Sequence, residues 1–418
     1  MNIFVLPGSL HGDNFGDVAM LQVALARLNK IWPGAALHVL TEDPVRLKQF
    51  CPVAEPVAWL GFYRWLAAST LPRPFFPDIP GKIRRQFPLR YGKILPLTRL
   101  LNPRYGVATR QFARAFFNAD LVVLAGCGLV NDAFKPQAGR MLAALAAAQA
   151  ANIPTAMLGQ GIGPLTDPEL RAQAATVLPG VGFIFLRERN TSPELLRQIS
   201  VPENKIVFTG DDTVELACNE RATRMGNGIG ISLRLATYAG LTAAALPGIR
   251  KIISAKARQP PAPLIGLPIY VGEKDSDRQT IAQLIGAENS GADLASPLAV
   301  IRRTAACRVV VAGSYHAAVF ALAQGIPVVG IVQARYYAEK FHGLAGEFDG
   351  GCTVLAADEP NFAAQLTSAV EAAWAQADEW KPRLLRAAER QIQCAHTAYA
   401  RLPELLKPGI SDRPRGKF

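Results

Sequence analysis

The sequence lacks the features of a secreted or membrane-spanning protein. None of its 418 residues belongs to an uninterrupted apolar stretch of about 18–20 residues, the length that a spanning helix needs. The opening MNIFVLPGSLHGDNFGD has no basic leader, and its apolar run Ile3–Leu6 is too short for a secretory signal. The six cysteines have no paired metal-ligand spacing, which is typical of reduced thiols in a cytosolic protein. We therefore expect a cytoplasmic protein without a metal site.

Acidic residues are also scarce. The chain has 33 acidic and 45 basic residues, which gives a net charge of +12. Between Ile79 and Asn118 there are nine basic residues and no acidic one. Such an excess favours anionic partners, namely nucleic acid, a membrane surface or phosphorylated small molecules. No nucleic-acid-binding module or repeated aromatic platform is recognisable, so we expect no nucleic-acid partner.

The chain is long enough for two domains, and its first half alternates short β runs with helical patterns. Single hydrophobic cores stop growing beyond roughly 250–300 residues. The predicted strands are residues 3–6, 36–40, 121–125, 155–158, 183–186 and 206–209, with helices such as 17–28, 141–151 and 168–177 between them. This alternation favours a parallel sheet covered on both faces by helices.

A charged, glycine-containing stretch interrupts the pattern, which then restarts. Strands are predicted at 228–233, 264–270, 308–312, 327–332 and 353–355, followed by alanine-rich helices at 361–377 and 378–399. We predict an α/β fold of two Rossmann-like domains that face each other across a cleft. The predicted divisions are an N-terminal domain of residues 1–217, a linker of 218–227, a C-terminal domain of 228–400 and a basic tail of 401–418.

One segment, near residues 59–115, fits neither half. It begins with WLGFYRW and continues through proline-rich breaks into the basic run, so aromatic and cationic side chains are interleaved. Such a mixture suits an element that lies at a lipid headgroup surface. It equally suits an insertion that packs on the first domain and presents a solvated basic face. The sequence leaves both interpretations open.

The loop His11–Asp17 follows the first predicted strand and precedes a helix. Ligands of open α/β sheets lie beyond the carboxyl ends of the strands, near the free N–H groups of helix N-termini. Asn14 and Asp17 are therefore candidates for hydrogen bonds to ligand hydroxyls. The alternative for Asp17 is that it only caps the helix.

Two further glycine-rich loops follow strands of the same half. They are GCGLVND at 126–132, which ends in Asp132, and GQGIGP at 159–164, which contains Gly161. Glycine lets the backbone approach a ligand closely. Three such loops at the ends of parallel strands predict a binding edge.

The two strongest candidates for catalysis follow strands in different halves. Arg187 can place a planar guanidinium against a carboxylate or phosphate. His316 opens a helix, where the positive end of the helix dipole lowers the pKa of the ring and favours a neutral base. A surface ion pair for Arg187 and a structural role for His316 are the alternatives.

These motifs, in this order, resemble the polysaccharide pyruvyl transferase family. The resemblance spans roughly residues 1–345. It is carried by NFGD at 14–17, the loops at 126–132 and 159–164, LRERNTS at 186–192 and SYHAAVFALAQGIPVVGI at 314–331.

The resemblance implies a glycosyltransferase-B-like fold and transfer of the carboxyvinyl unit of phosphoenolpyruvate to two sugar hydroxyls, with release of phosphate. It implies no cofactor besides this co-substrate. Arg187 matches the donor-binding arginine, His316 matches the acid/base histidine, and Lys340 lies where the family often has a lysine. Gly161 belongs to the same donor side, and Asn14, Asp17 and Asp132 are expected to contact the acceptor.

One position departs from the family pattern. The family carries an arginine two residues before the histidine, and here that residue is Ser314. Arg234, Arg335 or Lys340 can supply the missing charge, or the donor differs from phosphoenolpyruvate.

Two other functions compete with pyruvyl transfer. One is a glycosyltransferase with a nucleotide-sugar donor, and the other is a non-catalytic protein that binds glycan during polysaccharide assembly. For the basic aromatic segment we predict peripheral contact with anionic membrane at its inner face, where a lipid-linked glycan acceptor would lie.

Overall fold

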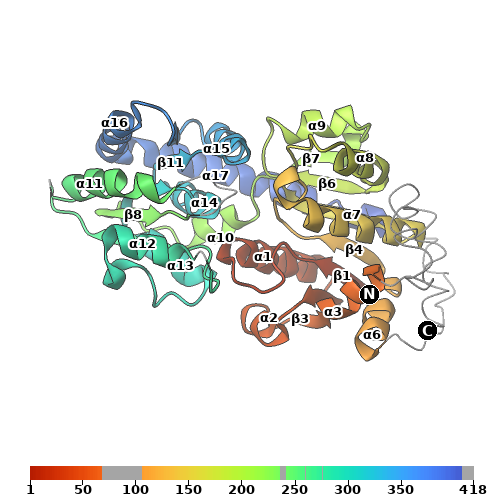
Figure 1. The fold of residues 1–418 in the computed structure, drawn as a ribbon. Helices are drawn as coiled ribbons and strands as arrows, with labels where there is room; N and C mark the ends of the chain where they lie inside the picture. The colour runs from red at the N-terminus through yellow and green to blue at the C-terminus, as the bar shows by residue number, and fades with distance from the viewer. Residues whose placement is uncertain (68–105, 236–241, 259, 275, 407–418) are drawn as a thin grey trace, which may run out of the picture.

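The computed structural model contains two α/β units, each built around a parallel sheet (Figure 1). It describes residues 1–67, 106–235, 242–258, 260–274 and 276–406. Every strand pair in both sheets is parallel. The predicted α/β fold class is therefore confirmed.

The first sheet has seven strands in the order β3-β2-β1-β4-β5-β6-β7. The strands are β1 (Asn2–Leu6), β2 (Ala36–Thr41), β3 (Ala54–Ala58), β4 (Leu121–Leu124), β5 (Thr155–Gln160), β6 (Phe183–Leu186) and β7 (Ile206–Phe208). The helices are α1 (Phe15–Ile31), α2 (Pro44–Phe50), α3 (Trp59–Ala67), α6 (Val107–Phe117), α7 (Lys135–Ala150), α8 (Pro168–Val177) and α9 (Ser192–Gln198). The strand order reverses between β1 and β4, and such switch points open a crevice at the carboxyl ends of the strands.

Both faces of this sheet are buried because alternate strand residues enter two different cores. Phe4 and Leu6 of β1 join one cluster with residues of α3, α6, α7 and α8. Ile3 and Val5 of the same strand join the other cluster, which includes residues of α1. This arrangement explains why the strands are almost continuously apolar in sequence.

The second sheet has five strands in the order β12-β11-β10-β8-β9. The strands are β8 (Gly228–Ser232), β9 (Leu264–Gly266), β10 (Cys307–Ala312), β11 (Val328–Val332) and β12 (Cys352–Ala356). Its helices are α11 (Leu246–Lys256), α12 (Asp277–Ile285), α13 (Pro297–Thr304), α14 (Tyr315–Ala323), α15 (Arg335–Glu347) and α16 (Phe362–Ala375). It is also covered on both faces, since Val310 and Val311 of β10 enter different cores.

Two helices join the halves. The chain leaves the first sheet through α10 (Thr213–Asn219), and α17 (Ala377–Tyr399) returns to it. Leu384 and Ala388 of α17 pack in the core of the second domain. Tyr399 packs on the first sheet, in the core that contains Ile3. The predicted C-terminal domain, 228–400, thus differs from the structure at its end, because the last turns of α17 complete the first domain.

The described ends of the 59–115 segment are helices that belong to the first domain. Phe62 and Trp65 of α3 are buried against Phe112 and Phe116 of α6, with ring centroids 5.3–6.2 Å apart. These aromatic side chains therefore face the core. The intervening residues 68–105, and the tail from 407, lie outside the described residues. None of the described helices is long and apolar enough to cross a membrane.

Candidate active site

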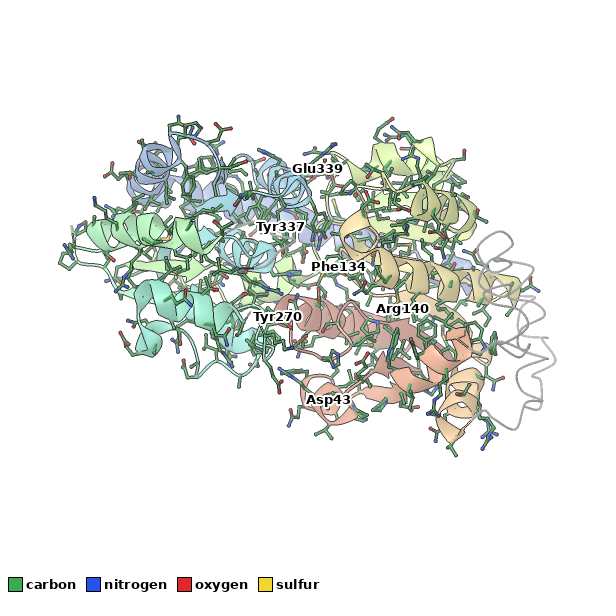
Figure 2. The ribbon with its side chains drawn as sticks, viewed as in Figure 1. Asp43, Phe134, Arg140, Tyr270, Tyr337 and Glu339 are labelled. Carbon is green, nitrogen blue, oxygen red and sulfur yellow. The ribbon has the colours of Figure 1, made fainter. Side chains whose placement is uncertain are left out.

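A cleft between the two domains brings most of the predicted site residues together. Phe134, Tyr270 and Tyr337, which also line it, mark its place at the junction of the two domains in Figure 2. It encloses about 710 Å³ of space, part of it open to solvent. The predicted residues that line it are Asn14, Asp17 and Arg187 from the first domain, and Arg234, Ser314, His316 and Lys340 from the second. The cleft is therefore a composite site, to which each domain contributes at the ends of its strands.

Loops from the two domains are hydrogen-bonded to each other at the cleft. The backbone N–H of Phe15 donates to the carbonyl of Ile269 at 2.8 Å, and that of Val271 donates to the carbonyl of Asp13 at 2.8 Å. On another side, the Tyr336 hydroxyl donates to the carbonyl of Gly128 at 2.7 Å. These bonds hold the glycine-rich loops of the first domain against the second domain.

Arg187, directly after β6, is almost completely buried, with 3% of its surface exposed. Its Nη1 lies 3.5 Å from Asp211 Oδ2, and its guanidinium carbon lies 4.3 Å from the ring centre of Tyr315. Its Nη2 has no hydrogen-bond partner among the described residues. An added Cβ at Gly161 would lie 2.8 Å from Nε, which explains why this position is glycine. Gly161 thus leaves room for the Arg187 side chain and does not itself line the cleft.

The side chains of Lys340, in α15, and Arg187 both lie next to Gly128. An added Cβ at Gly128 would lie 2.8 Å from Arg187 Nη2 and 2.9 Å from Lys340 Nζ. Burial lowers the pKa of Lys340 well below its usual value, and the neighbouring Arg187 lowers it further. Two basic side chains held this close in a buried cleft form a site in which a bound anion would favour the charged form of Lys340.

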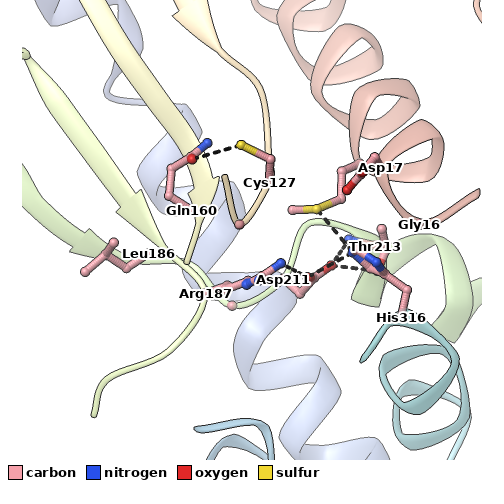
Figure 3. A network of polar contacts seen from close by, with 12 residues as sticks. Gly16, Asp17, Cys127, Gln160, Leu186, Arg187, Asp211, Thr213 and His316 are labelled. Carbon is pink, nitrogen blue, oxygen red and sulfur yellow. Dashed lines mark hydrogen bonds and ion pairs between the residues drawn. The ribbon is translucent and has the colours of Figure 1, made fainter. Parts of the chain in front are cut away.

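His316 lies at the start of α14 with 6% of its surface exposed. Its Nε2 is 3.4 Å from the sulfur of Met20 and 3.7 Å from Asp211 Oδ2 (Figure 3). Gly16 makes room for the ring, since an added Cβ there would lie 1.9 Å from Nδ1. Burial lowers the pKa of His316 to about 4, helped by Arg187 and Lys340 and opposed by Asp211. The ring is thus neutral at pH 7, as predicted, but burial is the main cause.

Ser314, at the position where the resemblance implies an arginine, bonds to a buried carboxylate. Its hydroxyl donates to Asp277 Oδ2 at 3.0 Å, which also accepts from the backbone N–H groups of Ile269 and Tyr270. Asp277 Oδ1 lies 3.9 Å from Arg234 Nε. The Arg234 guanidinium carbon lies 3.9 Å from the ring centre of Tyr270. A different arginine thus lies in the part of the cleft that Ser314 lines.

Asn14, one of the residues expected to contact the acceptor, caps α1. Its Oδ1 accepts from the backbone N–H groups of Gly16 at 3.0 Å and Asp17 at 3.3 Å. The capping role considered for Asp17 therefore belongs to Asn14, and Asp17 lines the cleft from the first turn of the helix. Burial raises the pKa of Asp17 to about 6, although Lys340 and Arg187 lower it.

Besides Gly161, two other predicted residues lie outside the cleft, Asp132 and Arg335. The carboxylate of Asp132 accepts hydrogen bonds from the backbone and hydroxyl of Thr166 and from the backbone N–H of Asp167, at 2.6–3.1 Å. Arg335 has a side chain that is 81% exposed and pairs with Glu339, four residues along α15. The expected acceptor role of Asp132 and donor role of Arg335 therefore have no support in the geometry, because one holds a loop and the other faces solvent.

Several residues of the site were not predicted. Asp211, Asp277 and Tyr315 are buried in or beside the cleft, and Tyr270 and Tyr337 line it (Figure 2). The sequence GDDT at 210–213 directly after a predicted strand was a usable signal for Asp211. Among the described residues, no group of three or more His, Cys, Asp or Glu side chains is arranged to hold a metal ion.

Comparison with known proteins decides the family. The sequence profile of polysaccharide pyruvyl transferases matches residues 14–334, more than half of the chain. The chain belongs to the polysaccharide pyruvyl transferase family. Membership identifies the protein as a transferase of polysaccharide modification. A search of curated proteins found no match.

Solved structures with the same architecture are glycosyltransferases and epimerases of low sequence identity. The chain resembles the glycotransferase of kitacinnamycin (TM-score 0.54, 15% identity, 97% of this chain and 99% of that one). It also resembles a glycosyltransferase from Rickettsia africae (TM-score 0.53, 11% identity, 97% and 99%) and the HepE protein of Anabaena in complex with UDP (TM-score 0.51, 16% identity, 97% and 99%). The predicted glycosyltransferase-B-like fold is confirmed.

Proposed function

We propose that this protein transfers a pyruvate ketal from phosphoenolpyruvate to two hydroxyls of a sugar in a surface polysaccharide or its lipid-linked precursor. The observation that carries the proposal is the pair of buried basic side chains, Arg187 and Lys340, in one cleft with the neutral imidazole of His316. Phosphoenolpyruvate has both a phosphate and a carboxylate, so a donor-binding site for it needs several cations around a small space.

The reaction needs three proton transfers, one to the methylene carbon of the donor and one from each of the two sugar hydroxyls. A first sugar hydroxyl adds to the enol carbon while a proton adds to the methylene carbon, which becomes a methyl group. A second hydroxyl then attacks the same carbon, and the bond to the phosphate oxygen breaks with its electron pair leaving on phosphate. The products are a cyclic ketal and free phosphate, and each hydroxyl loses its proton to a base.

Each of these side chains of the cleft has a role in one or more of these steps. Arg187 and Lys340 stabilise the charge of the donor and of the departing phosphate, the kind of electrostatic contribution that is usually the largest in catalysis. Arg234 supplies the positive charge that an arginine at position 314 would have provided, because Arg234 and Ser314 both lie beside Asp277 and line the cleft. His316 exchanges the proton. Asn14 and Asp17 contact the acceptor hydroxyls.

Phosphate release with phosphoenolpyruvate and a glycan acceptor tests this proposal. We expect His316→Ala to reduce turnover by about 10²–10⁴-fold, the usual contribution of a general base. His342→Ala is the matched control, because His342 is an exposed histidine of α15. Glycan binding without any donor consumption by the wild-type protein would instead indicate a non-catalytic assembly protein.

Two of the structurally similar proteins suggest an alternative donor, a nucleotide sugar. Structures of HepE and of S. aureus MnaA contain UDP. A thermal-shift comparison of phosphoenolpyruvate with a panel of nucleotide sugars separates the two functions. We expect stabilisation by phosphoenolpyruvate that is lost in Lys340→Met. Stabilisation by a nucleotide sugar alone would favour a glycosyltransferase.

We also propose that α3 contacts an anionic membrane surface. Leu60 and Tyr63 of α3 are about half exposed although both are large and apolar, and Arg64 beside them is exposed. Cosedimentation with phosphatidylserine vesicles at low and moderate salt tests this contact. We expect Leu60→Ser with Tyr63→Ser to reduce binding, and Val45→Ser, at an exposed position of α2, to leave it unchanged. Equal recovery with neutral vesicles would contradict the proposal.

A further inference from the structure

Asp211 lies between the two principal residues of the cleft without a full set of partners. It follows β7 and is 4% exposed. Its Oδ2 is 3.5 Å from Arg187 Nη1 and 3.7 Å from His316 Nε2, and it has no hydrogen-bond partner among the described residues (Figure 3). A buried carboxylate oxygen without a hydrogen bond is costly, so its persistence at this place needs a reason.

The other oxygen of Asp211 fixes the direction of the carboxylate. Oδ1 accepts from the Thr213 backbone N–H at 3.0 Å and from the Thr213 hydroxyl at 2.6 Å. With Oδ1 held by these two donors, Oδ2 must point toward Arg187 and His316. The carboxylate is thus aimed by residues that do not line the cleft.

The surroundings of His316 Nε2 determine which ring nitrogen carries the proton. Nε2 lies near two acceptors, Asp211 Oδ2 and the sulfur of Met20, whereas no hydrogen bond from Nδ1 is present among the described residues. A proton on Nε2 leaves the lone pair on Nδ1, beside Gly16. The separation of 3.7 Å is longer than a hydrogen bond, and such contacts commonly shorten when substrate binds.

We infer that Asp211 is a positioning residue, which holds His316 in the tautomer with the proton on Nε2 and orients Arg187 toward the donor. The inference rests on the proposed function for its catalytic consequence, but the state of His316 can be measured without any substrate. Arg187, Lys340 and Asp211 are the charged groups that act on the ring.

Asp211→Asn is the sharpest test. Because the two Thr213 donors select the amide oxygen for the Oδ1 position, the NH₂ group takes the Oδ2 position and presents a donor to Nε2. We expect the tautomer to reverse, which ¹⁵N NMR of histidine-labelled protein reports from the shifts of the two ring nitrogens at pH 7. A reversed tautomer reduces kcat by up to about 10⁴-fold when histidine acts as a base. We also expect a higher KM for phosphoenolpyruvate, because Arg187 loses its neighbouring carboxylate.

Two further variants keep the test informative. Asp212→Asn changes the adjacent buried aspartate, which does not contact His316, and we expect it to lower Tm while the tautomer stays unchanged. If Asp211→Asn does not fold, Thr213→Val should give a smaller shift in the same direction, and Thr213→Ser should restore the wild-type spectrum and kcat.

The outcomes separate this inference from the proposed function. Unchanged ring shifts and unchanged kcat in Asp211→Asn would overturn the role of Asp211 while pyruvyl transfer stood. Failure of the wild-type protein to release phosphate, together with a reversed tautomer in Asp211→Asn, would overturn the donor assignment and leave the positioning role supported.

Discussion

Two buried arginines of the first domain lie beside adjacent aspartates, yet their partners differ. Arg27 pairs with Asp212 at 2.6 Å and with Glu215 at 2.7 Å, and the Tyr399 hydroxyl donates to Asp212 at 2.8 Å. Arg187 comes no closer than 3.5 Å to Asp211, and its Nη2 has no hydrogen-bond partner among the described residues. The Arg27 cluster joins α1, α10 and α17, whereas the cleft cluster keeps charge available for a ligand.

This contrast separates stability from function. A buried charge in close ion pairs holds elements together, and removal of one partner leaves the others uncompensated. A buried charge whose nearest carboxylate lies beyond hydrogen-bond distance costs free energy without a ligand, and such charges are typical of functional sites. Four predictions test the contrast, and their expected effects decrease in the order given.

The largest effect is expected from Arg27→Met. The substitution leaves Asp212 buried without its cation, so the free energy of unfolding should fall by about 3–5 kcal/mol in urea denaturation. Turnover per folded molecule should remain near the wild-type value. Lys30→Met, at an exposed position of the same helix, is the control and should change stability by less than about 0.5 kcal/mol. Loss of activity with unchanged stability in Arg27→Met would contradict the structural role of Arg27.

Lys340→Met should show the reverse pattern. We expect kcat/KM for the donor to fall by about 10²–10³-fold, as when one stabilising group of an active site is removed. Tm should stay the same or rise, because burial makes the charge of Lys340 unfavourable in the empty fold. Lys251→Met, at an exposed position of α11, serves as the control. A marked fall in Tm would show that Lys340 has a structural role.

Gly128→Ala should disturb both cations without removing either. The new methyl group would lie within 3 Å of Arg187 Nη2 and Lys340 Nζ, so the two side chains must move. Small displacements of positioned groups cost up to about 10²-fold, and we expect a rise of roughly 10-fold in KM for the donor. Gly248→Ala is the control, since a Cβ there meets no atom within 4 Å. An unchanged KM would mean that the cations do not bind the donor together.

The smallest effect concerns the pH dependence of stability. Burial lowers the pKa of His316 from 6.5 to about 4, so the unfolded state binds that proton first and stability falls as the pH drops through this window. Burial raises the pKa of Asp17 from 3.8 to about 6, so the folded state binds its proton first and stability rises as the pH drops through that window. The two trends oppose each other.

Single substitutions should expose each trend. Calorimetry between pH 6.5 and 4 should show a smaller loss of stability on acidification in His316→Gln than in wild type, and a larger loss in Asp17→Asn. Parallel curves for all three proteins would contradict the assigned protonation states.

The sequence predicted the elements whose ends carry local signals. Strand β6 and helix α8 begin and end at the predicted residues, and α8 has an aspartate cap and a proline in its first turn. Strand β3 was not predicted, because Ala54–Ala58 contains a proline and a glutamate and has only one β-branched residue. A strand was predicted over 264–270, but β9 ends at Gly266, after which the chain bonds to the loop of the first domain.

The site was predictable where a motif follows a strand and was not predictable where it depends on contacts between residues far apart in the sequence. Arg187 and His316 came from such motifs, and Lys340 came from the resemblance to the family. Asp277 follows no predicted strand, and what makes it part of the cleft is its bond to Ser314, 37 residues away. Arg335 and Lys340 are five residues apart, and only the packing of α15 shows that one is exposed and the other faces Arg187.

The path of α17 has a practical consequence for dissecting this protein. Its first turns pack with the second domain, and its last turns fill the core beside β1. A fragment cut between β7 and β8 would therefore lose Tyr399, the partner of Asp212, and expose the apolar surface that this helix covers. The two halves are not independent modules, and exchange of one half between relatives would have to carry the C-terminal helix with the N-terminal half.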